Sequence, residues 1–299
     1  MRLRILHVSG ISIPTPPSGY GGTELVVDTL AKYQVRYGHK VFVLGIRNYS
    51  KDTRYEYDII PVFQNTVRRP RAWHKVVFNI KTIINSINAD IVHLHIQTAI
   101  PSSILLKIIS KPTLLTLHVD PPMSGIISNI AKKYVRLIAV SNSQRERLER
   151  HGFRIYDVVY HGLELSNYTF HESKEDYLVF LGRIDPSKGT HIAVKIAKLL
   201  NERLIIMGPI SDREYFMNYV APHIDNKQII YLSEVSFKTK VDYLSRAKAL
   251  LYPVQYDEYF GVAMIEALAC GTPVIGFARG SVTEIIRHGI NGYLVNNID

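Results

Sequence analysis

Glu258 and Glu266 stand eight residues apart in the stretch 256–275, which carries the strongest chemical signal of the chain. Glu266 is surrounded by small and apolar residues, and a carboxylate in such surroundings requires a polar partner. That partner is either a pair of ligand hydroxyl groups or a buried structural ion pair, and the sequence leaves both open. We expect a helix to begin near 260–261, which places Glu258 in the preceding loop and turns the first N–H groups of the helix toward an anion.

Arg183 and Lys188 form a second candidate site, because both follow the apolar run 177–181 and precede a helix expected over 187–200. In a parallel sheet this is the carboxyl edge, where ligands bind. Two cations and a helix N-terminus at that edge can neutralise a diphosphate. The alternative is a pair of solvated surface charges.

Gly21 and Gly22 belong to a glycine-rich loop that runs into an expected helix over 23–37. Unpaired N–H groups at a helix start favour phosphate, and glycines let the backbone approach it closely. A mobile loop with a helix capped by Thr23 is the alternative. The loop is neither G-x-G-x-x-G nor a Walker sequence, so neither a dinucleotide site nor an ATP site is indicated.

His118 closes the apolar strand expected over 113–117. A histidine at a strand's carboxyl end is well placed for an active site, and a hydrogen-bonded interfacial histidine is the alternative. His93 and His95 alternate along one strand and should share a face. No second cluster and no Asp-x-Asp motif accompanies them, so the sequence predicts no metal site.

The elements that must position these residues alternate along the whole chain, and strands alternating with helices predict parallel sheets covered on both faces. The alternation of expected strands and helices is interrupted over 161–174, so we expect two Rossmann-like domains, residues 1–163 and 164–299. The second stops without a terminal helix, which predicts a short version of its fold. The expected strands are 3–8, 41–45, 91–94, 113–117, 137–140, 157–160, 177–181, 204–207, 229–232, 249–252, 274–276 and 292–295, and further helices are expected over 73–87, 101–109 and 142–150.

The composition agrees with two globular domains. The chain has 299 residues, of which 46% are hydrophobic and 21% charged, and this excludes disordered, collagen-like and coiled-coil proteins. A single cysteine, Cys270, excludes a disulfide framework and fits a reducing compartment. No apolar run is long enough to span a bilayer, and the N-terminal one is too short for a signal peptide, so a cytoplasmic location is expected.

The charge is unevenly distributed. Residues 1–160 carry 22 Lys+Arg against 10 Asp+Glu, a net +12, whereas the rest carry 14 against 16, a net −2. A basic half suits a phosphate-bearing acceptor, an anionic membrane or nucleic acid, and the absence of a nucleic-acid motif puts nucleic acid last. Peripheral contact with an anionic membrane therefore competes with a merely solvated basic surface. Its candidate residues are Arg68, Arg69, Arg71, Lys132 and Lys133, with Trp73 and Phe78 as apolar contacts.

The order and spacing of the motifs resemble the retaining, nucleotide-sugar-dependent glycosyltransferases of the GT4 family. The resemblance implies the GT-B fold, in which two Rossmann-like domains with parallel sheets face a central cleft. It rests on Gly21-Gly22-Thr23-Glu24, Gly38-His39-Lys40-Val41, Thr116-Leu117-His118, Ala139-Val140-Ser141-Asn142, Tyr160-His161-Gly162, Gly182-Arg183 with Lys188-Gly189, and the Glu258/Glu266 pair followed by Gly271-Thr272-Pro273-Val274-Ile275.

The resemblance also implies roles for the donor-diphosphate residues. Arg183 and Lys188 would bind the diphosphate, and Gly22, next to Gly21, would approach it from the first domain. The family usually needs no divalent metal, so no cofactor is expected. One departure is His161, where the family pattern has Asn.

Around the sugar, the resemblance implies that Glu258 faces the donor-sugar hydroxyls, Glu266 holds the ribose and His118 lies beside the reacting sugar. The donor-binding set further includes Tyr259, Phe260, Gly261 and Val262.

The implied activity is hexosyl transfer from a nucleoside-diphosphate sugar to an acceptor hydroxyl on a lipid, glycan or other molecule. The alternatives are a non-catalytic sugar-nucleotide-binding or interaction protein and a GT-B sugar-nucleotide epimerase. A Rossmann oxidoreductase is disfavoured because its fingerprint is absent.

Overall fold

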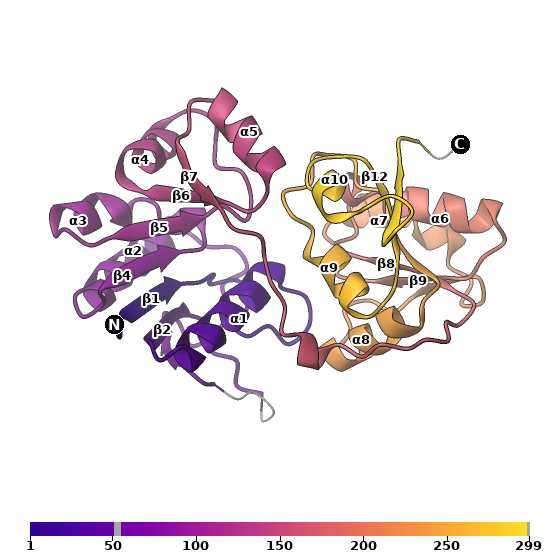
Figure 1. The fold of residues 1–299 in the computed structure, drawn as a ribbon, viewed down its shortest axis with the longest axis horizontal. Helices are drawn as coiled ribbons and strands as arrows, with labels where there is room; N and C mark the ends of the chain where they lie inside the picture. The colour runs from indigo at the N-terminus through magenta and orange to yellow at the C-terminus, as the bar shows by residue number, and fades with distance from the viewer. Residues whose placement is uncertain (51–54, 298–299) are drawn as a thin grey trace. The chain divides into compact units, whose positions relative to one another are not determined.

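The computed structural model describes residues 1–50 and 55–297, and the chain forms two compact α/β units, Met1–Gly162 and Leu163–Asp299. The expected domain boundary lay between residues 163 and 164. The last two residues of the expected second domain, 298–299, lie outside the described residues. Each unit is a parallel sheet with helices on both faces, which confirms the predicted fold class (Figure 1).

The sheet of the first unit has the strand order β3-β2-β1-β4-β5-β6-β7, with every neighbouring pair parallel. Its strands are β1 (Arg4–Val8), β2 (Lys40–Gly45), β3 (Asp58–Pro61), β4 (Ile91–Leu94), β5 (Thr113–Thr116), β6 (Arg136–Ala139) and β7 (Ile155–Val158). Its helices are α1 (Gly22–Arg36), α2 (Ala72–Ser86), α3 (Ser102–Ile108), α4 (Ile126–Tyr134) and α5 (Asn142–Arg150), with the short 3-10 helix η1 (Gln97–Ala99).

The sheet of the second unit has the order β10-β9-β8-β11-β12-β13 and is likewise parallel. Its strands are β8 (Leu178–Leu181), β9 (Leu204–Met207), β10 (Ile229–Tyr231), β11 (Ala249–Tyr252), β12 (Val274–Phe277) and β13 (Gly292–Val295). Its helices are α6 (Thr190–Leu199), α7 (Arg213–Tyr219), α8 (Phe237–Arg246), α9 (Val262–Ala269) and α10 (Val282–Ile285), and its 3-10 helices are η2 (Leu165–Asn167), η3 (Pro186–Lys188) and η4 (Ala221–His223).

The cores show which helices cover which face. In the first unit, side chains of α2, α3, α4 and α5 join one large cluster under the sheet, whereas α1 packs on the other face in a smaller cluster with β2. In the second unit, α8, α9 and α10 cover one face and α6 and α7 the other. Strands such as β9, with all four residues buried, are apolar throughout because they are covered on both sides.

In the described part of the first unit, one strand and one α-helix have no counterpart among the expected strands and helices. Strand β3 is a four-residue edge strand that ends in a proline and is only partly buried, so its apolar pattern is short. Helix α4 is only nine residues long; it packs Ile127 and Ile130 against the core but leaves Ile126 exposed, so its apolar period is short and interrupted. Helix α6 begins at Thr190 rather than at 187, because η3 takes up the preceding turn.

The strand order reverses between β1 and β4 in the first sheet and between β8 and β11 in the second. Ligands of open parallel sheets bind outside the carboxyl ends of the strands at these points. The loops after β1 and β4, and those after β8 and β11, are therefore the segments in which to look for chemistry.

Candidate functional site

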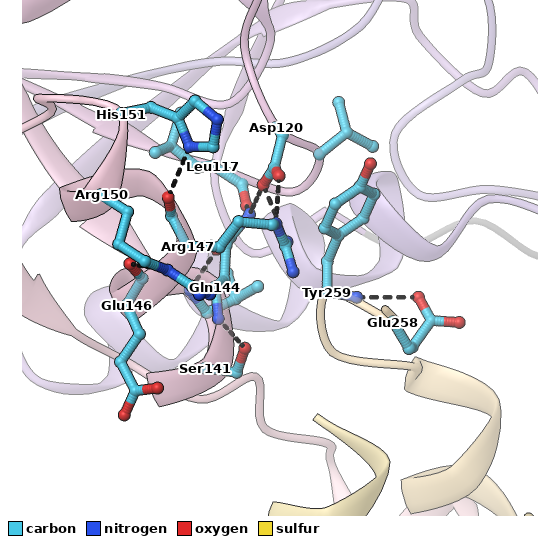
Figure 2. Close-up of polar contacts among 12 residues, drawn as sticks. Leu117, Asp120, Ser141, Gln144, Glu146, Arg147, Arg150, His151, Glu258 and Tyr259 are labelled. Carbon is cyan, nitrogen blue, oxygen red and sulfur yellow. Dashed lines mark hydrogen bonds and ion pairs between the residues drawn. The ribbon is translucent and has the colours of Figure 1, made fainter. Parts of the chain in front are cut away.

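Lys188 and Glu258 meet at the switch point of the second sheet. Lys188 Nζ lies 2.7 Å from Glu258 Oε2, and both side chains are largely buried. Lys188 Nζ also donates to the Tyr256 hydroxyl, while the hydroxyls of Tyr252 and Tyr256 donate to the two carboxylate oxygens at 2.5 and 2.8 Å. The Tyr259 N–H donates to Oε1 at 3.2 Å (Figure 2). Two sequence-predicted residues are thus brought into one hydrogen-bonded cluster.

Glu258 remains an anion in this cluster. Burial alone would raise its pKa, but the Lys188 ammonium and the hydroxyls of Tyr252 and Tyr256 outweigh burial, so the pKa of Glu258 is lowered. The same hydroxyls fix the direction of the carboxylate. The site therefore holds a rigid, ionised acceptor next to a cation.

Arg183 lies in the loop between β8 and η3, beside this cluster in the chain. Its side chain is 44% exposed, and its Nε lies 3.6 Å from Asp185 Oδ2, too long for a strong hydrogen bond. Asp185 is occupied elsewhere, since it caps η3 and accepts from the Ser187 hydroxyl. Arg183 is consequently a guanidinium that an anionic ligand can reach.

Gly189 allows the close approach that brings Lys188 to Glu258. It has φ 72°, and a Cβ at this position would lie 2.1 Å from the carbonyl oxygen of Pro253, in the loop after β11. Because backbone cannot yield by that much, only glycine lets the start of α6 pack against the loop. The glycine thereby links the segment that carries Lys188 to the one that carries Glu258.

Glu266 is buried in α9 and is held by two residues that the sequence analysis did not single out. Lys240 of α8 pairs with Glu266 Oε1, and the Tyr168 hydroxyl donates to the same oxygen at 3.0 Å. Burial raises the pKa of Tyr168, and the negative charge of the Glu266 carboxylate raises it further. The structural ion pair that the sequence left open is present, and a role toward ribose would have to be played by a carboxylate already paired with a lysine. Glu266 is the fifth residue of α9, one turn into the helix.

The N-terminus of α9 is placed as the sequence predicted. Gly261 is its N-cap, in the left-handed conformation, and Val262 is its first residue, so the first N–H groups of the helix face outward from its start. Phe260 is buried as a whole, and its carbonyl oxygen accepts a hydrogen bond from the Ser281 hydroxyl. Tyr259, the next residue back, is partly exposed.

Gly21 and Gly22 mark the start of α1 at the switch point of the first sheet. Gly21 is the N-cap with φ 153°, and a Cβ there would lie 2.8 Å from Pro17 Cβ. Thr23 is therefore the second residue of the helix, and the alternative in which it caps the helix is wrong. Glu24 lies buried beneath the loop, and burial raises its pKa to about 7.

The loop after His118 is anchored by a polar network on α5 (Figure 2). Arg147 donates to both oxygens of Asp120, at 2.6 and 3.1 Å, and Gln144 donates to Asp120 and to the Leu117 carbonyl. Ser141 caps the same helix through the Gln144 N–H. These side chains fix the backbone on either side of His118. The sequence analysis did not predict this network, and the only sequence signal for it is the position of Asp120 just after the end of a strand.

His118 also stands at one end of a group of histidines. His7 of β1 contacts His95, which contacts His118, and His161 stacks on His118 with ring centroids 4.9 Å apart. His7, His93 and His95 each place a nitrogen within 4.8 Å of the others, a spacing within reach of a metal ion. The sequence predicted no such cluster, because only the pairing of β1 with β4 brings His7 to the other two.

The basic residues of the first unit differ in their availability. Arg68, Arg69, Arg71, Lys133 and Trp73 are exposed. Phe78 is fully buried in the core, so its expected apolar contact with a membrane is wrong. Lys132 donates to the carbonyl of His151 and lies over the Phe153 ring, which commits it to the fold. Across residues 1–50 and 55–297, no helix combines the length and apolar character needed to cross a bilayer.

Two family models match the chain one after the other. A model described as Glycosyltransferase Family 4 matches residues 20–167, and one described as Glycosyl transferases group 1 matches residues 164–299.

Among curated relatives, an uncharacterized glycosyltransferase of Methanocaldococcus jannaschii is 27% identical over 72% of this chain and 63% of its own length. A D-inositol 3-phosphate glycosyltransferase of Pseudarthrobacter chlorophenolicus is 30% identical over 54% of this chain and 44% of its own length. The matches thus span less than two thirds of these relatives.

Solved structures agree on the fold. HepE of Anabaena, in complex with UDP and glucose, superposes with a TM-score of 0.80 at 18% identity, over 100% of this chain and 87% of that one. Sucrose-phosphate synthase of Thermosynechococcus elongatus gives 0.80 at 19% identity, over 98% and 86%. Since the two family models together run from residue 20 to residue 299, the chain belongs to the GT4-type glycosyltransferases and has their GT-B fold.

Proposed function

We propose that the protein transfers a hexose from a nucleoside-diphosphate sugar to an acceptor hydroxyl, with retention of configuration at the sugar. The observation that carries the proposal is the Lys188–Glu258 cluster at the switch point of the second sheet, with Arg183 exposed beside it in the chain. Support comes from HepE, whose structures contain UDP with glucose and UDP-glucose. The second unit, 164–299, would be the donor domain and the first, 1–163, the acceptor domain.

The charges suit cleavage of a glycosyl phosphate bond. As the bond breaks, negative charge grows on the departing diphosphate and positive charge on the sugar. Arg183, Lys188 and the start of α9 would stabilise the first. Glu258, kept ionised, would favour the second through its charge, and a sugar hydroxyl would replace one of the four donors from which its oxygens already accept hydrogen bonds.

Retention with the leaving group on the acceptor's side lets a diphosphate oxygen take the acceptor's proton, so the protein need not supply a base. Glu258 and Glu266 then differ from the paired catalytic carboxylates of a glycoside hydrolase. Each is bound by a lysine of its own, Lys188 and Lys240 respectively. A neighbouring lysine favours the ionised form of a carboxylate. The pairing therefore suits a carboxylate that binds a ligand better than one that must keep a proton and act as a general acid.

Purified protein tests this function. Incubated with UDP-, GDP- and ADP-sugars, it should release a nucleoside diphosphate from at least one, slowly to water and faster when a suitable acceptor is added. Binding without turnover of any donor would favour the non-catalytic sugar-nucleotide-binding alternative. Interconversion of two sugar nucleotides would favour an epimerase.

We further propose that transfer needs no divalent metal, because Arg183, Lys188 and the helix ends supply positive charge at the diphosphate. Activity should therefore survive EDTA. The measurement is the initial rate with and without chelator, with Mg²⁺ or Mn²⁺ added back. If chelation abolished activity and a metal restored it, the diphosphate would be held in another way.

The two glutamates should be separable by ligand. Glu266→Gln should weaken both the free nucleoside diphosphate and the donor, because an amide no longer offers two charged oxygens to a ribose diol. Glu258→Gln should spare the diphosphate and weaken only the sugar-bearing donor. Calorimetry with both ligands measures this, and thermal unfolding of each variant controls for the loss of the lysine pairs. Equal losses for the two variants would refute the division of roles.

We also propose that the first unit contacts an anionic, phosphate-bearing surface that carries the acceptor, such as a membrane. Apolar side chains spaced three or four residues apart along α2 and its C-cap are half or more exposed: Trp73, Val76, Ile80, Ile84 and Ile87. Arg68, Arg69 and Arg71 lie exposed just before this helix. A helix with an apolar face and basic flanks is typical of segments that lie in a membrane interface.

Liposome co-sedimentation tests the contact. The protein should bind anionic but not zwitterionic vesicles, and binding should fade as salt rises. Ile80→Ser with Ile84→Ser should weaken it. The matched control is Leu199→Ser with Leu200→Ser, which removes an even more exposed apolar pair from the second unit. Indifference to lipid charge would favour a soluble acceptor.

A further inference from the structure

A continuous line of hydrogen bonds runs through the first unit from α1 to His118. Gln34 Oε1 lies 2.6 Å from His7 Nε2, and His7 Nδ1 lies 2.9 Å from His95 Nε2. His95 Nδ1 in turn lies 3.0 Å from His118 Nε2. Both ring nitrogens of His7 and of His95 are therefore used, and each ring connects one neighbour to the next.

The direction of the line follows from its first member. An amide oxygen only accepts hydrogen bonds, so His7 must carry its proton on Nε2. A neutral imidazole has one N–H, which leaves His7 Nδ1 as an acceptor and requires the proton of His95 on Nε2. The same step repeats at the next contact and puts the proton of His118 on Nε2.

We propose that Gln34, His7 and His95 are positioning residues that fix His118 in the Nε2–H tautomer and leave its Nδ1 to accept a hydrogen bond from a sugar hydroxyl. The role of the sugar rests on the function proposed above, whereas the tautomer does not. His161, stacked on His118 with an interplanar angle of 23°, holds the plane of the ring. The departure from Asn at this position thus places a second imidazole against the candidate catalytic one.

The line requires neutral rings, and burial provides them. It lowers the pKa of His7 to about 4 and that of His161 to about 4, and it also lowers the pKa of His95 and His118. At neutral pH each ring therefore keeps one donor and one acceptor. The line of hydrogen bonds from Gln34 through His7 and His95 to His118, called the relay below, needs both.

Metal binding is a weaker use of the same cluster. His7 and His95 could release a nitrogen to a metal only by breaking the line, and His93 already contacts the Thr116 hydroxyl through Nε2 at 2.8 Å. Both ring nitrogens of His7 and of His95 are thus engaged by neighbours, so a metal would have to displace a hydrogen bond at each of these two ligands. The relay explains these contacts without rearrangement.

The test is long-range ¹H–¹⁵N correlation NMR on histidine-labelled full-length protein in EDTA at neutral pH, which separates protonated from unprotonated ring nitrogens. His7, His95 and His118 should all show the proton on Nε2 in the wild type. Gln34→Met should give mixed tautomers at all three, while Gln34→Glu, which keeps an acceptor, should preserve them. Thr116→Val, which keeps the backbone and removes only the hydroxyl that contacts His93, is the matched control and should leave the three unchanged.

Activity gives the second readout. Gln34→Met should lower kcat roughly tenfold, the size of one lost hydrogen bond, with little change in the donor KM, and Gln34→Glu should restore it. A proton on Nδ1 of His118 in the wild type, or a His118 tautomer indifferent to Gln34→Met, would overturn the proposal. Nε2 protons in a protein that transfers no sugar would leave the relay standing and refute the proposed function instead.

Discussion

Lowering the pH from about 7.5 to about 5.5 should destabilise the first unit strongly. Five of its histidines have lowered pKa values, chiefly because burial penalises the charged ring: His7, His93, His95, His118 and His161. On unfolding, each returns toward its ordinary pKa of about 6.5. Between about pH 4 and 6.5 the unfolded chain therefore binds more protons than the folded one, and stability falls as the pH falls.

The expected effect is large. At about pH 5.5 each buried neutral histidine costs about 1.4 kcal/mol relative to high pH, so five together approach the whole stability of an ordinary domain. Glu24 acts in the opposite direction: its raised pKa of about 7 means that its contribution is lost as pH rises from about 4.5 to 7. Because one carboxyl group opposes five imidazoles, the first unit still loses stability as the pH falls.

Thermal unfolding followed by circular dichroism measures this loss, and Tm should drop by roughly 10 °C or more over that range. His93→Gln should make the drop smaller, because it removes one of the five without cutting the relay. His151→Gln, which removes an exposed histidine of the same unit, is the matched control and should keep the wild-type slope. A Tm that is flat between the two pH values would show that these rings are not buried and neutral.

The second large effect concerns Lys188. Lys188→Ala leaves the buried Glu258 carboxylate without its cation, and breaking a buried pair in this way costs about 3–5 kcal/mol of folding stability. Replacing both partners, as in Lys188→Met with Glu258→Gln, should cost much less than the single change, because no uncompensated charge remains. Chemical denaturation of the wild type, Lys188→Ala and the double variant measures the difference, and a double variant at least as destabilised as Lys188→Ala would contradict the pair.

Arg183→Ala is the matched variant for catalysis. Arg183 is half-exposed and weakly paired, so its removal should change stability by no more than about 0.5 kcal/mol. Turnover should nevertheless fall about tenfold to over a hundredfold in both Arg183→Ala and Lys188→Ala, and by more than donor binding does, since each loses about 1.5–3 kcal/mol of charge-assisted contact. Near-normal turnover per folded molecule in both would remove these residues from the site.

The sequence predicted the parts of the structure whose pattern is local. The apolar strands of the second unit were predicted because burial on both faces requires a continuous run of apolar residues. The loop position of Glu258 was predicted because the residues around the start of the next helix show where that helix begins. Helix α4 was missed because it is short and because the exposed Ile126 interrupts the apolar pattern of Ile127 and Ile130, which pack on the core. Phe78 was misplaced because an aromatic residue beside exposed arginines has the same local signature whether it points in or out.

The partners of the candidate residues were not predictable in the same way. Lys240 and Tyr168 lie 26 and 98 positions from Glu266, and His7 lies 88 from His95, so only the packing of α8 on α9 and the order of strands bring them together. The relay to His118 is therefore a property of the fold that no single stretch of sequence displays.

The most direct test of the central claim is calorimetric titration of the wild-type protein with UDP, GDP and ADP. At least one should bind at a single site, and Arg183→Ala should weaken that binding. Lys195→Ala, which removes an exposed cation on α6, should not. Absence of binding by all three nucleotides, or equal affinity in the wild type and Arg183→Ala, would contradict a nucleoside-diphosphate site at the switch point of the second sheet.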